Sequence, residues 1–283
     1  TVNPERAGSA MRLNLVYGLP LAQGGVLLAG VFIIVKAKWA LPMQRIVLGS
    51  GSFLPWGFLL LMITLVLGNS YLFPWVEDPN PHRAPYLNLP FLYLRHFVLI
   101  GLLTLVSFSF MRIIRRLDAG FGRDSAPGKL KDLWEKWSAK WKGDEAELAA
   151  ARPMLSKLAA IIIVLYPIAY SFMAWDLVMA LDPHWYTTMI SAWFFAGGIL
   201  LGFASLSVLS IIVRRAYRLS EFLTPNTYHD QGKLLFAFST FWAYLIWSMF
   251  LPIWYANMPE ETDWLVLRLQ DPYLGWVLGA LVL

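Results

Sequence analysis

The chain alternates long apolar runs with short polar connections. Six runs reach the roughly 20 residues that a helix needs to cross a hydrocarbon core of about 30 Å. They cover residues 15–35, 46–68, 93–114, 158–180, 189–213 and 234–255. Each run is apolar on all sides, whereas the strands of a membrane barrel alternate over about 10 residues. The pattern predicts an all-α integral membrane protein, built as a polytopic transmembrane helix bundle.

A seventh apolar run begins near Tyr273 and stops at Leu283, which is too short to span. Since the sequence also begins at Thr1 rather than Met, we expect residues 1–283 to be a single transmembrane domain, a fragment of a longer chain. The composition fits a membrane protein, because 58% of the residues are hydrophobic and only 14% are charged.

Lys and Arg are distributed unevenly over the connections. Eighteen lie in residues 36–45, 112–157 and 214–233, and three, Arg83, Arg95 and Arg268, lie in the alternate connections. Basic residues remain on the cytoplasmic side of a membrane, so we expect the segment around Asp182 to face outward. The net charge of +5 then belongs to cytoplasmic loops near anionic lipid headgroups, and nucleic-acid binding is not expected.

The 112–157 connection contains an amphipathic stretch at residues 129–151. Apolar residues recur there at helical spacing between lysines: Leu130, Leu133, Trp134, Trp137 and Trp141 alternate with Lys131, Lys136, Lys140 and Lys142. This pattern predicts an interfacial helix on the cytoplasmic leaflet, with its indoles at headgroup depth. Docking of the same face against a partner subunit is the alternative.

Titratable groups gather where the fourth run ends. Asp176, Asp182, His184 and Tyr186 follow one another there, and Arg95 and His96 begin the third run at the same outer depth. A carboxylate, an imidazole and a phenol at one depth suit a proton relay or a quinol site.

A purely structural interpretation of these residues is also open. In it, Asp176 pairs with Arg95, Asp182 begins a turn with Pro183, and residues 184–186 form an aromatic belt.

Other polar or small residues inside the runs predict packing. Gln23 can form a hydrogen bond across helices, and five glycines mark close helix approach: Gly24, Gly25, Gly197, Gly198 and Gly202. Three tryptophans, Trp242, Trp247 and Trp254, could line a quinone channel, but membrane packing is the favoured explanation.

The chain lacks the ligands for a redox centre of its own. It has no cysteine, which excludes cysteine-held iron–sulfur clusters, and of its four histidines only His96 begins a span. We therefore expect no intrinsic haem, metal or other cofactor.

The segment DLVMALDPHWYTTMISAWFFAGG, residues 176–198, resembles the ActF-type membrane subunit of alternative complex III, a bacterial quinol:cytochrome c oxidoreductase. The segment GLPLAQGGVLLAGVFIIVKAKW, residues 18–39, resembles a helix of the NrfD-like superfamily, the polysulfide-reductase membrane subunits. The resemblance implies a longer multi-pass chain of two four-helix bundles in the bacterial inner membrane.

The resemblance also implies partners and a role. The partners would be a second NrfD-like subunit, an iron–sulfur protein and a multihaem cytochrome c, which would carry the clusters and the haem c. Lipids and menaquinol or another quinol would be ligands. The chain itself would be a non-redox subunit that supports quinol binding, proton release or conduction, or assembly.

Two other functions fit the apolar pattern. A secondary transporter would show paired broken helices and ionisable groups at the membrane midplane, but the runs here contain no charge at their centres and are expected to be unbroken. A purely structural scaffold subunit would differ only in the absence of chemistry at the outer cluster.

Overall fold

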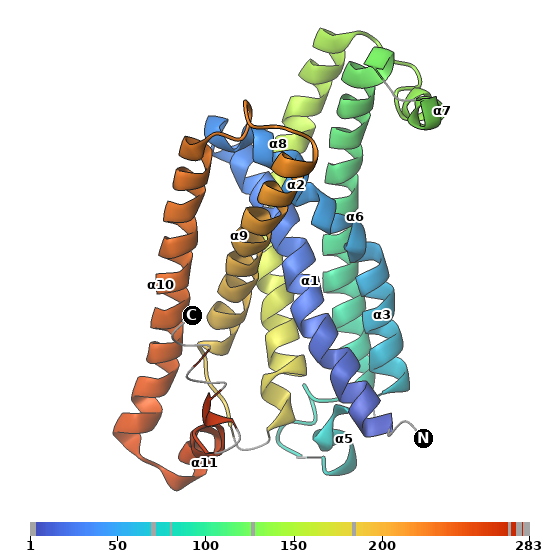
Figure 1. Cartoon of the computed structure of the whole chain (residues 1–283). Helices are drawn as coiled ribbons and strands as arrows, with labels where there is room; N and C mark the ends of the chain where they lie inside the picture. The colour runs from blue at the N-terminus through green and yellow to red at the C-terminus, as the bar shows by residue number, and fades with distance from the viewer. Residues whose placement is uncertain are drawn as a thin grey trace.

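The computed structural model describes residues 4–68, 72–79, 81–125, 128–182, 185–270, 273–275 and 279, and these residues are helical or irregular, with no strand (Figure 1). The α-helices are α1 Pro4–Ile34, α2 Leu41–Leu48, α3 Leu54–Leu67, α5 Pro74–Glu77, α6 Leu89–Gly122, α7 Gly128–Trp137, α8 Asp144–Leu177, α9 Ile190–Ala216, α10 Pro225–Ala256 and α11 Pro259–Arg268. Four 3₁₀ segments accompany them: η1 Lys38–Ala40, η2 Gly49–Phe53, η3 Arg123–Ser125 and η4 Met179–Leu181.

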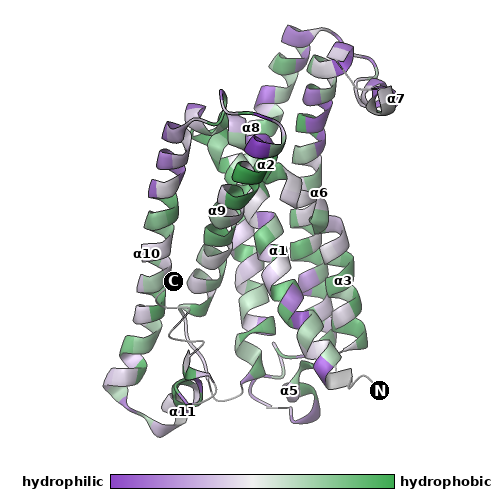
Figure 2. Cartoon of the chain, viewed as in Figure 1, coloured by the Kyte–Doolittle hydropathy of each residue, from purple (hydrophilic) through white to green (hydrophobic). Residues whose placement is uncertain are grey.

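Six helical segments are long and apolar enough to cross a membrane, which confirms the six predicted spans. They are Arg6–Ile34, Lys38–Leu67, Leu89–Ser125, Asp144–Leu181, Ile190–Ala216 and Pro225–Ala256. Hydrophilic residues concentrate toward the two ends of the long helices (Figure 2). These features are those of a multi-pass membrane protein. Most of the seventh run, residues 276–278 and 280–283, lies outside the described residues.

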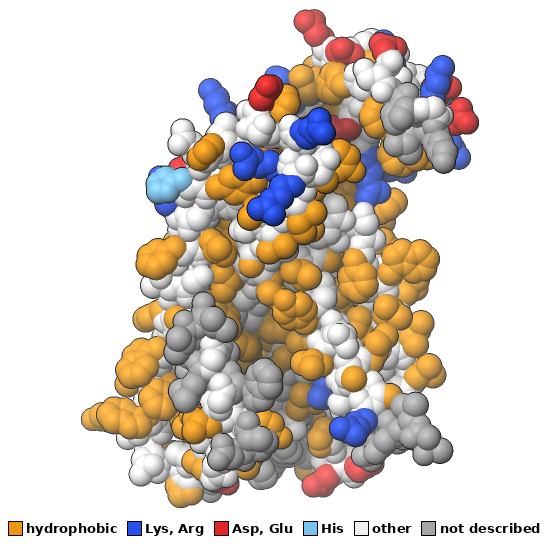
Figure 3. Space-filling view, viewed as in Figure 1, with side chains coloured by type: hydrophobic (Ala, Val, Ile, Leu, Met, Phe, Trp, Pro, Cys, Tyr) orange, Lys and Arg blue, Asp and Glu red, His pale blue; other side chains and the backbone are white. Residues whose placement is uncertain are grey.

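The molecule has two distinct ends (Figures 1 and 3). The basic end holds α2, α7 and the connection between α9 and α10, and Lys and Arg side chains gather there. The opposite end holds α5, η4 and α11. Arg6 and Arg12, in the first turns of α1, also belong to the opposite end.

Helix α1 lies at the centre of the fold. It contacts α3, α8 and α9, while α6 contacts both α3 and α8, so that α1, α3, α6 and α8 meet in a closed ring. Helix α10 packs mainly on α9 and leaves most of its surface uncovered. The predicted division into two four-helix bundles concerns a longer chain and stays a prediction.

Glycines allow α1 and α9 to approach closely, as the sequence predicted. A Cβ atom at Gly24 would collide with the backbone carbonyl of Gly198 and would lie 3.3 Å from the Cα of Gly202. Nearby, Gln23 and Ser107 join α1 to α6 by a buried hydrogen bond of 3.0 Å. Both features tighten the packing around α1.

The second span is not the unbroken helix that the sequence analysis expected. Its α-helical pattern gives way to the 3₁₀ segment η2 between α2 and α3. The local sequence Gly-Ser-Gly-Ser explains the break, because Gly and Ser are weak helix formers, and the Ser50 hydroxyl bonds the Val47 carbonyl at 2.7 Å. The other five spans are α-helical throughout their apolar centres.

The predicted single helix at residues 129–151 is also wrong in its extent. Helix α7 ends at Trp137, and residues 144–151 belong to the start of α8. Two of its indoles do not point to headgroups: Trp134 packs against Gly122, and Trp141 packs against Gly120 and Phe121. These tryptophans attach the connection to the end of α6, whereas Leu133 and Trp137 remain exposed.

The glycine contact between α1 and α9 can be tested by adding one methyl group. We expect Gly24→Ala to lower the free energy of unfolding by about 1–3 kcal/mol, because the methyl group meets backbone that cannot move aside without separating the helices. Thermal unfolding in detergent measures the effect. Gly232→Ala, in α10 with open space around it, is the matched control and should be neutral or slightly stabilising.

The absence of cysteine makes a topology test simple. Lys140, between α7 and α8, and Thr188, just before α9, are exposed at opposite ends of the molecule. We expect an impermeant maleimide to label Lys140→Cys only from the cytoplasmic side and Thr188→Cys only from the outer side. Labelling of both positions from one side would contradict the assignment.

Candidate functional site

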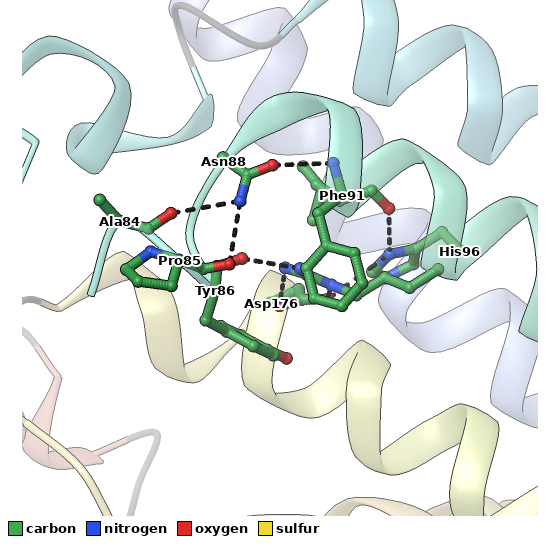
Figure 4. Close-up of polar contacts among 9 residues, drawn as sticks. Ala84, Pro85, Tyr86, Asn88, Phe91, His96 and Asp176 are labelled. Atoms are coloured by element: carbon green, nitrogen blue, oxygen red, sulfur yellow. Dashed lines mark hydrogen bonds and ion pairs between the residues drawn. The ribbon is translucent and has the colours of Figure 1, made fainter. Parts of the chain in front are cut away.

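A buried ion pair joins α6 to α8 near the opposite end. Arg95 Nε donates to Asp176 Oδ2 at 2.7 Å, and Arg95 Nη2 donates to Asp176 Oδ1 at 2.6 Å (Figure 4). The two side chains are 3% and 0% exposed. Paired N–H donors in this bidentate geometry form the strongest class of side-chain hydrogen bond. The pair predicted by the structural interpretation is therefore present.

The start of α6 explains how Arg95 reaches Asp176. Asn88 caps the helix, since its Oδ1 accepts a hydrogen bond from the backbone N–H of Phe91 at 2.9 Å. Its amide nitrogen also donates to the carbonyls of Ala84 and Pro85. The cap fixes the point at which the helix begins, and Arg95 follows two turns later on the face toward α8.

The preceding loop completes the surroundings of the guanidinium. Arg95 Nη1 donates to the Tyr86 carbonyl at 2.8 Å, and the rings of Tyr86 and Phe91 lie 4.1 Å and 4.8 Å from its central carbon. Both rings lie near the cation, which is favourable at a buried site. We call Tyr86, Arg95, His96 and Asp176 the ion-pair cluster.

His96 contributes a titratable ring to this cluster. Its Nδ1 lies 3.1 Å from the Leu92 carbonyl and 3.5 Å from Asp176 Oδ2. Both neighbours are acceptors, so Nδ1 carries the proton in the neutral ring. Nε2 is then the bare nitrogen, and it is buried with no hydrogen-bond partner among the described residues. The arrangement can accept a proton at Nε2.

A pocket of about 380 Å³ lies beside the cluster, at the edge of the molecule. Tyr86 lines it together with residues of the loop before α6, of the last turn of α8 and of the connection that follows: His82, Arg83, Leu87, Trp175, Met179, Ala180, Trp185 and Tyr186. Burial, and next the negative charge of Asp176, raise the pKa of the Tyr86 hydroxyl. Tyr86 therefore stays a neutral, protonated phenol between the pocket and the ion pair.

Two further predicted site residues, Asp182 and Tyr186, belong to the connection between α8 and α9. Tyr186 is exposed and lines the pocket. Asp182 Oδ1 accepts a hydrogen bond from the Trp185 backbone N–H at 3.3 Å, as in the predicted turn. His184 and Pro183 lie outside the described residues, so the predicted role of His184 stays a prediction.

Trp185 does not belong to an exposed aromatic belt. It is buried and stacks on Trp264 of α11, with ring centroids 4.0 Å apart and planes inclined by 3°. The guanidinium of Arg268 lies over the Trp264 ring, with its central carbon 3.6 Å from the ring centroid. Burial lowers the pKa of Arg268, while the nearby charge of Asp182 opposes that shift. This stack attaches α11 to the connection after α8.

A larger apolar cavity of about 750 Å³ lies among α1, α9 and α10. Leu177 and Val178, which directly follow Asp176, line one side of it, and Arg12 is the only ionisable cation among its lining residues. Trp242 lines the cavity, but the more exposed Trp247 and Trp254 do not. The Trp193 indole N–H is buried at this wall and finds no acceptor in the described part of the chain.

Sequence reasoning missed two residues that the structure adds to the site. Tyr86 lies nine residues before Arg95 in a loop, and only the three-dimensional contact reveals its role. Trp193 is one of fourteen tryptophans, and nothing in the sequence shows that its buried indole N–H lacks the acceptor that such groups usually find. No three His, Asp or Glu side chains of the described residues gather as metal ligands would.

The fold and the site together define a class: a multi-pass helical membrane protein with a buried ion pair near one end. No protein family matches the chain, and no characterised protein matches it in sequence. Functional assignment therefore depends on the chemistry of the site.

Removal of either partner from the ion pair should strongly destabilise the fold. We expect Arg95→Gln and Asp176→Asn each to lower the free energy of unfolding by about 3–5 kcal/mol, because one buried charge is left uncompensated. The double variant should recover part of that loss. Unfolding in detergent, followed by circular dichroism, measures all three.

The half-exposed pair Arg45–Asp118, with an N–O distance of 3.0 Å, is the matched control. Arg45→Gln and Asp118→Asn should each change stability by only about 0–1 kcal/mol, since solvent screens such pairs. Equal, small effects at both pairs would show that the buried pair does not hold α6 against α8.

Proposed function

We propose that this chain is a membrane subunit of a quinol-oxidising electron-transfer complex of the alternative complex III type, in a bacterial inner membrane. The observation that carries the proposal is the ion-pair cluster, in which a buried imidazole with a bare nitrogen lies against a fixed carboxylate. Quinol oxidation releases protons as well as electrons, and a group of this kind can take up one of those protons.

His96, rather than Asp176, is the group suited to carry that proton. Protonation of Asp176 would weaken two short hydrogen bonds from Arg95 and leave the guanidinium charge uncompensated, at a cost on the order of 3–5 kcal/mol. Protonation of His96 at Nε2 leaves both bonds intact. The Leu92 carbonyl orients the ring through Nδ1 at 3.1 Å, and the Asp176 carboxylate, 3.5 Å from the same nitrogen, stabilises the resulting imidazolium.

The large apolar cavity supports a role in quinol binding. Its volume lies in the range of small-molecule sites, which are mostly apolar with a few placed polar groups. The unpaired Trp193 indole can donate to a quinol or quinone oxygen, and the apolar walls suit an isoprenoid tail. Electrons would pass to haem and iron–sulfur centres in partner subunits, because no cysteine is present here.

A secondary transporter is the rival function, and the 3₁₀ break in the second span is the one observation that favours it. Paired breaks are the mark of that class, and the break at η2 has no counterpart in the other described spans. Copurification distinguishes the two, since only a complex subunit would bring haem- and cluster-bearing partners with it.

The proton-transfer role can be tested in the assembled complex. We expect His96→Gln to slow quinol oxidation roughly 100-fold, because glutamine keeps a polar side chain but cannot accept the proton. Turnover and proton release should be followed over a range of pH, so that a change in the pH profile is seen as well as a change in rate. The same measurements should be made on His184→Gln, because His184 lies in the segment that the sequence predicts to be functional.

His229→Gln is the control, because His229 is exposed at the basic end, away from the cluster. It should leave turnover and its pH profile unchanged. If His96→Gln and His184→Gln complexes assemble normally and also keep full turnover with an unchanged pH profile, the cluster is structural. The scaffold interpretation would then replace the proposed chemistry.

A further inference from the structure

A second cavity lies at the basic end, where α6 meets the end of α7. It has a volume of about 730 Å³, and four cationic side chains line it with two aromatic ones: Arg112, Arg115, Arg116, Lys136, Phe108 and Trp137. No Asp or Glu is among its lining residues. We call this cavity the basic groove. It shares no residue with the ion-pair cluster or with the apolar cavity.

The four cations differ in how their charges are compensated. Arg116 forms a two-point pair with Glu147, at 2.8 Å and 3.1 Å, and Arg115 donates to the Ser52 hydroxyl at 3.0 Å. Arg112 and Lys136 are exposed and have no hydrogen bond or ion pair within the described part of the chain. The groove therefore presents two uncompensated positive charges beside two anchored ones.

An apolar stripe leads from the groove along α6. Val98, Leu102, Leu105 and Phe108 are exposed and recur at three- or four-residue intervals, and Arg112 follows one turn after Phe108. These residues lie in the apolar part of the third span. Hydrocarbon surface therefore continues directly into a group of cations at the boundary of the membrane.

We propose that the basic groove binds an anionic phospholipid of the cytoplasmic leaflet. The phosphate lies between Arg112 and Lys136, and one acyl chain follows the α6 stripe below Phe108. Trp137 lies at headgroup depth, where an indole is favourable because one edge is polar and the ring is apolar.

Charge and shape together favour a lipid over other anions. A free phosphate or an acidic peptide would use the cations but would leave the adjoining apolar stripe unused. A zwitterionic lipid would use the stripe but would bring a positive headgroup against Arg112 and Lys136. Basic pockets at the cytoplasmic ends of membrane helices are known to select anionic headgroups. The proposal does not depend on the function proposed for the ion-pair cluster.

Lipid binding to the purified protein in detergent tests the proposal, with native mass spectrometry to count bound lipid. The probes are cardiolipin, phosphatidylglycerol, phosphatidylcholine and inorganic phosphate. We expect both anionic lipids to bind in preference to phosphatidylcholine. Arg112→Gln/Lys136→Gln should weaken that binding about 30-fold, because each cation near a headgroup contributes a factor of about five.

Arg152→Gln/Lys131→Gln is the matched control. The two substitutions remove the same charge from exposed positions at the basic end that do not line the groove. The variant protein should bind anionic lipid as the unchanged protein does. A stronger effect of cardiolipin than of phosphatidylglycerol would support occupancy by two phosphates, and equal effects would support one.

Three results would overturn the proposal. They are equal binding of phosphatidylcholine, full competition by inorganic phosphate at the concentration of the lipid, and unchanged lipid binding by Arg112→Gln/Lys136→Gln. A fourth contrary result would come from the assembled complex: cross-linking of Ala139→Cys, which lines the groove and leaves both cations in place, to a partner protein with no anionic lipid retained would assign the groove to a subunit interface.

Discussion

The Arg95–Asp176 pair is the constraint on which the arrangement of this molecule depends. A buried charge without a partner is unstable by several kcal/mol, so α6 and α8 can pack only in the rotation that brings these side chains together. The same contact determines where other groups lie. The Tyr86 carbonyl is held on Arg95, and His96 is placed beside the carboxylate. One ion pair thus fixes two helices, a loop and the candidate chemistry.

Two adjacent glycines give α1 its central position. Gly24 faces α9 at Gly198, while a Cβ at Gly25 would collide with Ser50 in the 3₁₀ break and lie 2.5 Å from the Val47 carbonyl. Because neighbouring residues on a helix point about 100° apart, the pair allows two different segments to approach α1 from two sides. The break at η2 is therefore part of the packing, since it brings the Ser50 hydroxyl against α1 beside the Val47 carbonyl at the end of α2.

The sequence predicted most of what depends on local pattern. Six spans follow from apolar length alone, and two ionisable residues at one depth made the Arg95–Asp176 pair one of two open interpretations. The failures concern contacts between distant residues. Trp185 looked like a belt residue because its partner, Trp264, is far along the chain. The helix predicted at residues 129–151 ends early because Trp134 and Trp141 pack on α6, and helical spacing does not reveal a tertiary contact.

The two ends of the bundle handle charge in opposite ways, and this difference separates their roles. At one end, Arg95 and Asp176 neutralise each other out of contact with solvent, so the cluster exerts little attraction on an ion outside, and the proton transfer proposed for it needs a proton delivered from within the protein. At the other end, Arg112 and Lys136 remain uncompensated at the surface, where a nearby anion is attracted before it makes contact. The first arrangement suits internal chemistry, and the second suits recruitment of a charged ligand from the membrane. The two arrangements of charge could not be interchanged between the ends, because cations without a partner would be unstable if they were buried among the side chains around Asp176.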